Sequence, residues 1–307
     1  MKFTSFSPHE LSLSESLDGC RIQDRWYSEH RDPDRSLLAD LPSLGLAIVG
    51  TRHPQRRSLE LVEKTISELK DTRMIIVSGF ARGIDSHAHE MAIQYGLQTL
   101  AILGCGIDQN YPKENRRLRD RIVDSGGMIL SPFALGTPPL PRNFFERNGL
   151  IAGLSQAVWV VEAAAVSGTL NTANWATRLN RQLYATPCFP GDHFYQGNEK
   201  LLSQRAPDRY PIAEPFFGVH SLTSTWTTLS NLGDSQDTFQ FKKGPTTEIQ
   251  RWVLELRSEW GECQVQALMN HASKNGKTLG QFYQEFEAEV EAGLIKHDSN
   301  GRVEVNL

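Results

Sequence analysis

Two glycine-containing segments, each with an arginine, follow successive apolar runs in the middle of the chain. They are Gly50-Thr51-Arg52 and Ser78-Gly79-Phe80-Ala81-Arg82-Gly83-Ile84-Asp85. Glycine lets the backbone approach a ligand closely, loop amides bind anions, and a guanidinium matches phosphate oxygens. Both segments therefore indicate phosphate binding, and we expect Asp85 to cap the helix that follows. The alternatives are an ordinary tight turn for the first segment and a structural loop for the second.

Two further segments are suited to an anion. Lys113, in Tyr111-Pro112-Lys113-Glu114-Asn115, precedes a basic helix, where the helix dipole favours an anion over a cation. A bound anion would explain this lysine, and the alternative is a solvated basic helix face. Ser167-Gly168-Thr169 opens another helix and is suited to a phosphate cradle. Glu162 lies shortly before it and is either catalytic or a cap for backbone amides.

Two aromatic residues lie between two arginines in Arg142-Asn143-Phe144-Phe145-Glu146-Arg147-Asn148. We expect this segment to be a loop, because it follows Gly136-Thr137-Pro138-Pro139. Aromatic rings beside cations suit unstacked bases and their phosphates. The alternative is that the two phenylalanines anchor a long loop in the core.

The segment Asp85-x-His87-x-His89 has the residue types of a metal site but the wrong spacing. Residues two apart on a helix point about 200° apart, so these histidines are expected to diverge and to pack or cap. No Ser/His/Asp order, metal cluster or carboxylate pair stands out as a catalytic set. We therefore expect no catalytic residue, no metal and no cofactor.

The elements that must position these segments alternate between strand and helix. Strands are predicted at 45–49, 74–77, 99–103, 128–130, 157–161 and 182–185, and helices at 58–70, 86–95, 115–124 and 171–179. The strands are apolar on both faces, as in a parallel sheet covered by helices on each side. The prediction is an α/β fold with a doubly wound, Rossmann-like domain over 45–205. Ligands of such sheets lie beyond the carboxyl ends of the strands, where most of these segments fall.

The flanking regions differ in character. Residues 1–44 are polar and irregular, and we interpret them as an arm or a remnant of a domain. Residues 206–245 carry several prolines and a Ser/Thr-rich stretch, which is typical of a linker. Residues 246–307 show three helical periodicities and a hairpin signal at Asp298-Ser299-Asn300-Gly301, which predicts a small winged-helix-like domain.

Composition limits the class of protein. The chain has 307 residues, which suggests about two domains, and 39% are hydrophobic, which excludes a wholly disordered chain. No apolar run approaches the roughly 18 residues of a membrane span, and residues 1–10 lack a signal-peptide profile. The four cysteines (Cys20, Cys105, Cys188 and Cys263) are far apart, so we expect reduced thiols in the cytoplasm.

Charge is distributed unevenly along the chain. The net charge is -4, yet residues 45–205 hold 18 basic and 14 acidic residues. The middle of the chain therefore attracts anions, although an excess of this size also arises by chance.

The motifs taken together resemble a known family. In order they read I-V-G-T-R, S-G-F-A-R-G-I-D, L-G-C-G-I-D-x-x-Y-P-K-E-N, G-T-P-P, N-F-F-E-R-N and S-G-T-L-N-T-A. From about Leu46 to Arg205 this pattern resembles the DNA-processing protein A family (DprA, also Smf). The resemblance implies an extended Rossmann core that dimerises and binds single-stranded DNA without sequence preference. It also implies protection of incoming DNA and loading of a RecA-type recombinase in natural transformation.

The resemblance implies DNA-binding roles for Arg52, Lys113 and Phe144. Thr51 stands where the family usually has Ser, Gly149 replaces a frequent basic residue, and Phe145 stands where Pro is usual, adding a second stacking ring or filling space. The complete candidate DNA-binding set is Gly50, Thr51, Arg52, Ser78, Gly79, Arg82, Gly83, Lys113, Asn143, Phe144, Arg147, Asn148, Ser167, Gly168 and Thr169.

Two alternatives to DNA binding are a nucleotide sensor and a nucleotide-processing enzyme of the phosphoribohydrolase type. Such hydrolases resemble this chain in their glycine-threonine phosphate loop, and they need a glutamate shortly after it. Here Thr169 is followed by Leu170, Asn171 and Thr172, so the carboxylate is missing at that spacing.

Overall fold

The computed structural model describes residues 3–8, 17, 20, 24–31, 36–188, 191–203, 212–226, 252–253, 265–274, 277, 281–282, 285–286, 295–297 and 303–305. The chain divides into two compact units, Met1–Phe239 and Gln240–Leu307. In the described part of the chain, no helix has both the length and the apolar character needed to cross a membrane.

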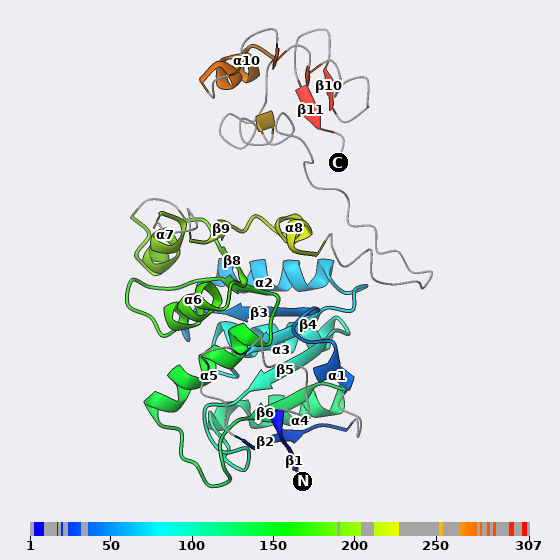
Figure 1. Ribbon diagram of the computed structural model, residues 1–307, viewed down its shortest axis with the longest axis vertical. Helices are drawn as coiled ribbons and strands as arrows, with labels where there is room; N and C mark the ends of the chain where they lie inside the picture. Colours follow the sequence, from blue (N-terminus) through cyan, green and yellow to red (C-terminus); the bar gives the residue numbers. More distant parts are fainter. Residues whose placement is uncertain are drawn as a thin grey trace. The chain divides into compact units, whose positions relative to one another are not determined.

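One sheet runs through the first unit, with strand order β1-β2-β6-β5-β4-β3-β7-β8-β9 (Figure 1). The pairs from β6 across to β9 are parallel, while β1 and β2 pair antiparallel with each other and β2 with β6. The bounds are β1 Thr4–Phe6, β2 Trp26–Glu29, β3 Gly45–Val49, β4 Ile75–Ser78, β5 Gln98–Ile102, β6 Met128–Ser131, β7 Ala157–Val160, β8 Gln182–Ala185 and β9 Glu214–Pro215.

Helices cover both faces of this sheet, as predicted for a doubly wound fold. Leu100 of β5 lies in a core cluster with Leu150 of α5, whereas its neighbour Ala101 lies in a second cluster with Ile122 of α4. Alternate residues of one strand thus face different helices. The helices are α1 Ser36–Ala39, α2 Arg56–Glu68, α3 Ile84–Gln94, α4 Arg116–Asp124, α5 Pro141–Gly153, α6 Thr169–Arg178, α7 Gln196–Ser203 and α8 Thr223–Trp226.

The direction in which the sheet grows reverses beside β3. Strands β4, β5 and β6 follow one another on one side of β3, and the chain then returns to place β7 on its other side. In open α/β sheets, ligands bind at such a reversal, outside the carboxyl ends of the strands. The segment Gly50-Thr51-Arg52 follows β3, and Ser167-Gly168-Thr169 comes after β7. The reversal therefore lies between two of the segments that the sequence singles out.

The irregular arm expected for residues 1–44 is corrected by the structure. Its described residues include β1 and β2, and Ser28 lies opposite Leu130 of β6. Trp26 is fully buried and contacts Phe6 edge to face at 6.1 Å. Two strands of three and four residues are too short to show a periodic pattern, so only their pairing in the folded sheet reveals them.

Part of the expected linker also packs on the first unit. Strand β9 pairs with β8, and Phe216 stacks on Trp159 with ring centroids 4.0 Å apart. Trp226 donates from its indole nitrogen to the Ser43 carbonyl at 3.0 Å. Residues 227–245 of the linker lie outside the described residues.

The second unit has a helix, α10 (Val265–Lys274), and a hairpin of β10 (Ile295–His297) and β11 (Val303–Val305). Lys296 lies opposite Glu304, so the predicted hairpin forms. A core cluster joins Leu268 of α10 to Ile295 and Val303. Residues 298–301 and much of the first and third predicted helices lie outside the described residues, and the winged-helix assignment stays a prediction.

Candidate nucleic-acid interface

Two adjoining cavities lie at the carboxyl edge of the sheet. The larger has a volume of about 540 Å³ and the smaller about 200 Å³, and Arg52, Ala81, Tyr111 and Phe144 line both. The larger cavity is also lined by Gly50, Thr51, Phe145, Arg147, Asn148, Ser167, Gly168, Thr169 and Thr172. Three segments far apart in the sequence therefore meet there, at the reversal between β3 and β7.

The loop that carries Arg52 is fixed by hydrogen bonds on both sides. The Thr51 amide donates to the Glu162 carbonyl at 2.8 Å, and the Thr51 carbonyl accepts from Ile84 at 3.2 Å. The Gln55 amide donates to Oε2 of Glu162 at 2.9 Å. The Arg52 side chain is exposed, and the described residues provide it with no hydrogen bond or ion pair. Its guanidinium is thus free to meet an anion.

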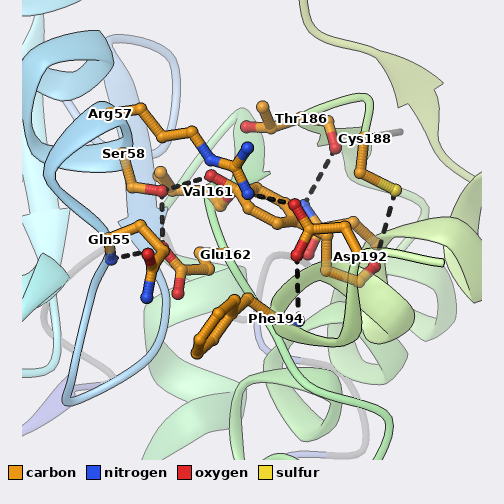
Figure 2. Close-up of polar contacts among 11 residues, drawn as sticks. Gln55, Arg57, Ser58, Val161, Glu162, Thr186, Cys188, Asp192 and Phe194 are labelled. Atoms are coloured by element: carbon orange, nitrogen blue, oxygen red, sulfur yellow. Dashed lines mark hydrogen bonds and ion pairs between the residues drawn. The ribbon is translucent and has the colours of Figure 1, made fainter. Parts of the chain in front are cut away.

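Glu162 anchors the start of α2. Figure 2 shows Gln55 and Ser58 pointing toward its carboxylate, and Ser58 Oγ donates to Oε2 at 2.5 Å. The Tyr195 hydroxyl lies 2.5 Å from Ser58 Oγ, and Arg57 forms an ion pair with Asp192. Glu162 is 1% exposed and lines neither cavity. Of its two predicted roles, the structure supports the capping of amides.

The segment from Ser78 to Asp85 turns several polar groups inward. Ser78 Oγ donates to the Ile48 carbonyl at 2.6 Å, so this hydroxyl joins β4 to β3 and lines neither cavity. Asp85 was expected to cap a helix, but it lies inside α3, and its Oδ2 accepts from the Ala81 amide at 3.3 Å. Gly79 and Arg82 do line the smaller cavity, where exposed Arg82 lies 3.6 Å from Glu114.

Gly83 and Lys113 are not brought into the cavities. Gly83 is the residue before α3, with φ +80°, and packs against the backbone of Arg52. Lys113 starts a 3-10 helix (Lys113–Asn115), is exposed and lines neither cavity, although Pro112 and Glu114 beside it line the smaller one. Lys113 therefore does not join Arg52 and Arg82 in lining the cavities, and its DNA-binding role stays a prediction.

The segment expected as a loop at 142–148 is helical and belongs to α5. Pro141 stands at its first turn, where the missing amide hydrogen and the fixed φ of proline suit a helix start. Asn143 is 4% exposed, lines neither cavity and donates to the Pro138 carbonyl at 3.1 Å. Asn148 lines the larger cavity and donates to Asn171 Oδ1 at 3.3 Å.

Arg147 faces the protein interior. It is 5% exposed and donates to the carbonyls of Gly79 and Ile102. Burial lowers the pKa of Arg147 to about 10, against the opposing effect of Asp85. Burial likewise raises the pKa of Asp85, and Arg147 opposes that rise. Arg147 lines the larger cavity, yet its donors serve the strand ends. The structure therefore gives it a structural role, and its DNA contact stays a prediction.

Phe144 is held in place from several sides. Its ring lies over Gly104, where an added Cβ atom would come within 2.5 Å of Cδ1. The Tyr111 ring lies 5.6 Å away at 47°, and the Arg147 guanidinium carbon lies 5.8 Å from the Phe144 centroid. The half-buried ring therefore enters both cavities in a fixed orientation.

The start of α6 completes the larger cavity. Ser167 Oγ accepts from the Thr169 amide at 3.2 Å, and Ser167, Gly168 and Thr169 all line the cavity. The helix is 10 residues long and begins at Thr169. The start of α6 and the Arg52 loop thus line the same cavity, and the helix dipole favours an anion at such a helix start.

The two histidines of the 85–89 segment diverge as expected. His87 Nε2 lies 3.1 Å from the Leu59 carbonyl, and His89 Nδ1 lies 2.7 Å from Thr99 Oγ1. Burial lowers the pKa of His89 to about 3. In the described part of the chain, no group of three His, Cys, Asp or Glu side chains is placed to hold a metal ion.

Several cavity residues are absent from the predicted set. Tyr111 and Phe145, 39% and 53% exposed, both line the larger cavity, as does Thr172. Tyr111 and Phe145 belong to segments that the sequence singles out, so their aromatic side chains could have been added to the set. Thr172 sits within a helix, and no sequence signal marks it. The arrangement combines an unpaired guanidinium, aromatic rings and backbone amides, which are the groups that bind a phosphate and stack a base.

Comparisons with known proteins, by family model and by sequence, agree with one another. The family model described as DNA recombination-mediator protein A matches residues 38–211. The protein Smf of Synechocystis is 42% identical over 168 residues, covering 52% of this chain and 42% of the relative. The DNA processing protein DprA of Streptococcus pneumoniae is 39% identical over 161 residues, covering 52% of this chain and 56% of the relative. The chain spans about half the length of these curated relatives.

Two solved structures share the fold. The crystal structure of DprA from Streptococcus pneumoniae matches with a TM-score of 0.61 and 32% identity, covering 73% of this chain and 74% of that one. DNA processing protein A from Helicobacter pylori, studied for its single-stranded DNA binding mode, matches with a TM-score of 0.61 and 25% identity. The match covers 74% of this chain and 97% of that one. The family model covers more than half of the residues, and the chain belongs to the DNA recombination-mediator protein A family.

Proposed function

We propose that this protein binds single-stranded DNA without sequence preference. One observation carries the proposal: the unpaired Arg52 and the fixed ring of Phe144 line the same two cavities. A guanidinium neutralises a backbone phosphate, and every base presents a π face to an aromatic ring, so the pair suits a strand of any sequence. The single-stranded DNA binding of the relative from Helicobacter pylori supports the same conclusion.

The family description also supports a proposal for the biological role. We propose that the protein protects incoming DNA and loads a RecA-type recombinase on it during transformation or recombination, acting as a cytoplasmic homodimer. The family description as a recombination mediator supports this role. Faster recombinase assembly on single strands in the presence of the protein would be the expected result, and light scattering would give the oligomeric state. The role would be contradicted if the protein neither speeds recombinase assembly nor protects single strands from nuclease digestion.

DNA binding itself is tested by fluorescence anisotropy with labelled single- and double-stranded oligonucleotides. We expect preference for the single strand, and affinity that falls steeply between about 50 mM and about 200 mM salt as counterion release weakens binding. Arg52→Glu is expected to bind about tenfold or more weakly, the range of a charged hydrogen bond. Lys70→Glu, which makes the same charge change at an exposed position before β4, is the control. Binding that is indifferent to salt, or unchanged in Arg52→Glu, would refute the proposal.

We do not favour the phosphoribohydrolase alternative, because the carboxylates near the site are bonded within the protein. Asp85 lines the larger cavity, but its Oδ2 accepts from the Ala81 amide. Glu162 is the carboxylate nearest in sequence to the Ser167-Gly168-Thr169 segment, and its Oε2 is bonded to Gln55 and Ser58 outside both cavities. Release of a base from AMP by the purified protein, abolished in Glu162→Gln, would overturn this assignment.

A further inference from the structure

Phe145 lies in the larger cavity beside Phe144. Its side chain is 53% exposed, and no other described residue forms a ring contact with it. A phenylalanine that anchored α5 in the core would be buried, as Leu150 and Ile151 of the same helix are at 2% and 1% exposure. Phe145 therefore does not serve the packing of α5.

The two adjacent rings cannot act as a single surface. Successive residues of an α-helix project about 100° apart around its axis, so Phe144 and Phe145 enter the cavity from different directions. Phe144 is held against Gly104 and Tyr111, whereas Phe145 is open to the cavity. The cavity thus offers two separate aromatic surfaces.

The chemistry around Phe145 indicates what covers it. Exposed apolar groups scattered on a surface need no explanation, but this ring shares a cavity with Arg52 and with the amides at the start of α6. Cations, amides and aromatic rings together suit a planar group attached to a phosphate. A volume of about 540 Å³ lies within the range of about 300–1,000 Å³ found for small-molecule sites.

We propose that Phe145 is a second base-stacking residue, so that the larger cavity holds two bases of one strand, one on Phe144 and one on Phe145. The inference rests on the proposed single-stranded DNA binding and adds a second stacking residue to it. Phe145 contributes through the base and not through the phosphate. Its loss therefore weakens binding only to strands that have bases.

The experiment compares variants on two probes of equal length, oligothymidylate and an abasic strand with the same sugar-phosphate backbone. Phe145→Ala is expected to bind oligothymidylate about 5-fold to about 100-fold more weakly, the range that one stacked base contributes, and to bind the abasic strand as the wild type does. Phe145→Trp restores affinity. Phe145→Leu, which keeps apolar bulk without a ring, does not.

A matched control and the outcomes separate this inference from the proposed function. Phe217→Ala removes another exposed phenylalanine, 66% exposed, that lines neither cavity, and is expected to bind both probes as the wild type does. If the wild type fails to bind oligothymidylate, the proposed function fails. If the wild type binds and Phe145→Ala binds equally well, or loses affinity for both probes alike, only the role of Phe145 is overturned.

Discussion

Gly83 lies directly against the backbone of Arg52. A Cβ atom added to Gly83 would come 2.7 Å from the Arg52 carbonyl carbon, 2.8 Å from its Cα atom and 2.4 Å from the Thr51 oxygen. The start of α3 therefore fixes the loop that presents the guanidinium, although Gly83 itself lines neither cavity.

We expect Gly83→Ala to weaken DNA binding without any change of charge, because the Arg52 loop must move to admit the methyl group. The variant also places a Cβ atom at φ +80° and ψ -126°, a sparsely populated backbone conformation whose strain costs about 1–3 kcal/mol. Gly96→Ala is the matched control, since Gly96 has φ +77° and open space around it. Equal DNA affinity for the two variants, measured by anisotropy, would contradict the role of this contact.

Glu162 is expected to hold the same loop from the β7 side. Glu162→Ala removes the acceptor for the Gln55 amide and Ser58 hydroxyl, so the free energy of unfolding falls by about 1–3 kcal/mol and DNA affinity falls with it. Glu162→Gln retains an acceptor oxygen and loses less. Urea unfolding and anisotropy measure the two effects. The control is Glu60→Ala, an exposed partner of Arg56, for which a change below about 1 kcal/mol is expected. A Glu162→Ala protein with wild-type stability would contradict the anchoring role.

Arg147→Met is expected to reduce stability by about 3–5 kcal/mol, because it leaves the carbonyls of Gly79 and Ile102 without donors and Asp85 buried without a nearby cation. A double-mutant cycle with Asp85→Asn, followed by urea unfolding, tests the coupling. The double variant should be more stable than the sum of the single effects indicates. Strictly additive effects would show that the two side chains do not interact.

His89 predicts a pH dependence of stability. Its folded pKa of about 3 lies below the ordinary value of 6.5, so the unfolded chain binds a proton that the folded chain does not. Stability is therefore lost as pH falls from about 7.5 to about 5, by about 2 kcal/mol from this residue. His89→Gln should lack this component in urea unfolding at the two pH values. His53→Gln, at an exposed histidine, should retain it, and equal pH slopes for wild type and His89→Gln would be the contrary result.

The residue order alone predicts much of the frame. Apolar runs such as 45–49 and 157–161, each followed by a glycine or a polar residue, identify strands of a covered parallel sheet, because a strand that is buried on both faces must be apolar throughout. The position of Arg52 after the first of these strands then follows from the rule that ligands bind at carboxyl ends. The cavity at this edge and the segments that enter it were foreseeable on these grounds.

Which side chains are free to act was decided by packing between distant segments. Arg147 and Arg52 are the same residue type in equally promising motifs, yet one donates to Gly79 and Ile102 while the other has no partner among the described residues. Similarly, a proline-flanked segment became α5 and brought Phe144 over Gly104, and Phe145 into the open cavity. A local pattern specifies what a residue can bind. Whether it is buried, paired or exposed depends on neighbours dozens of residues away, which only the folded chain brings together.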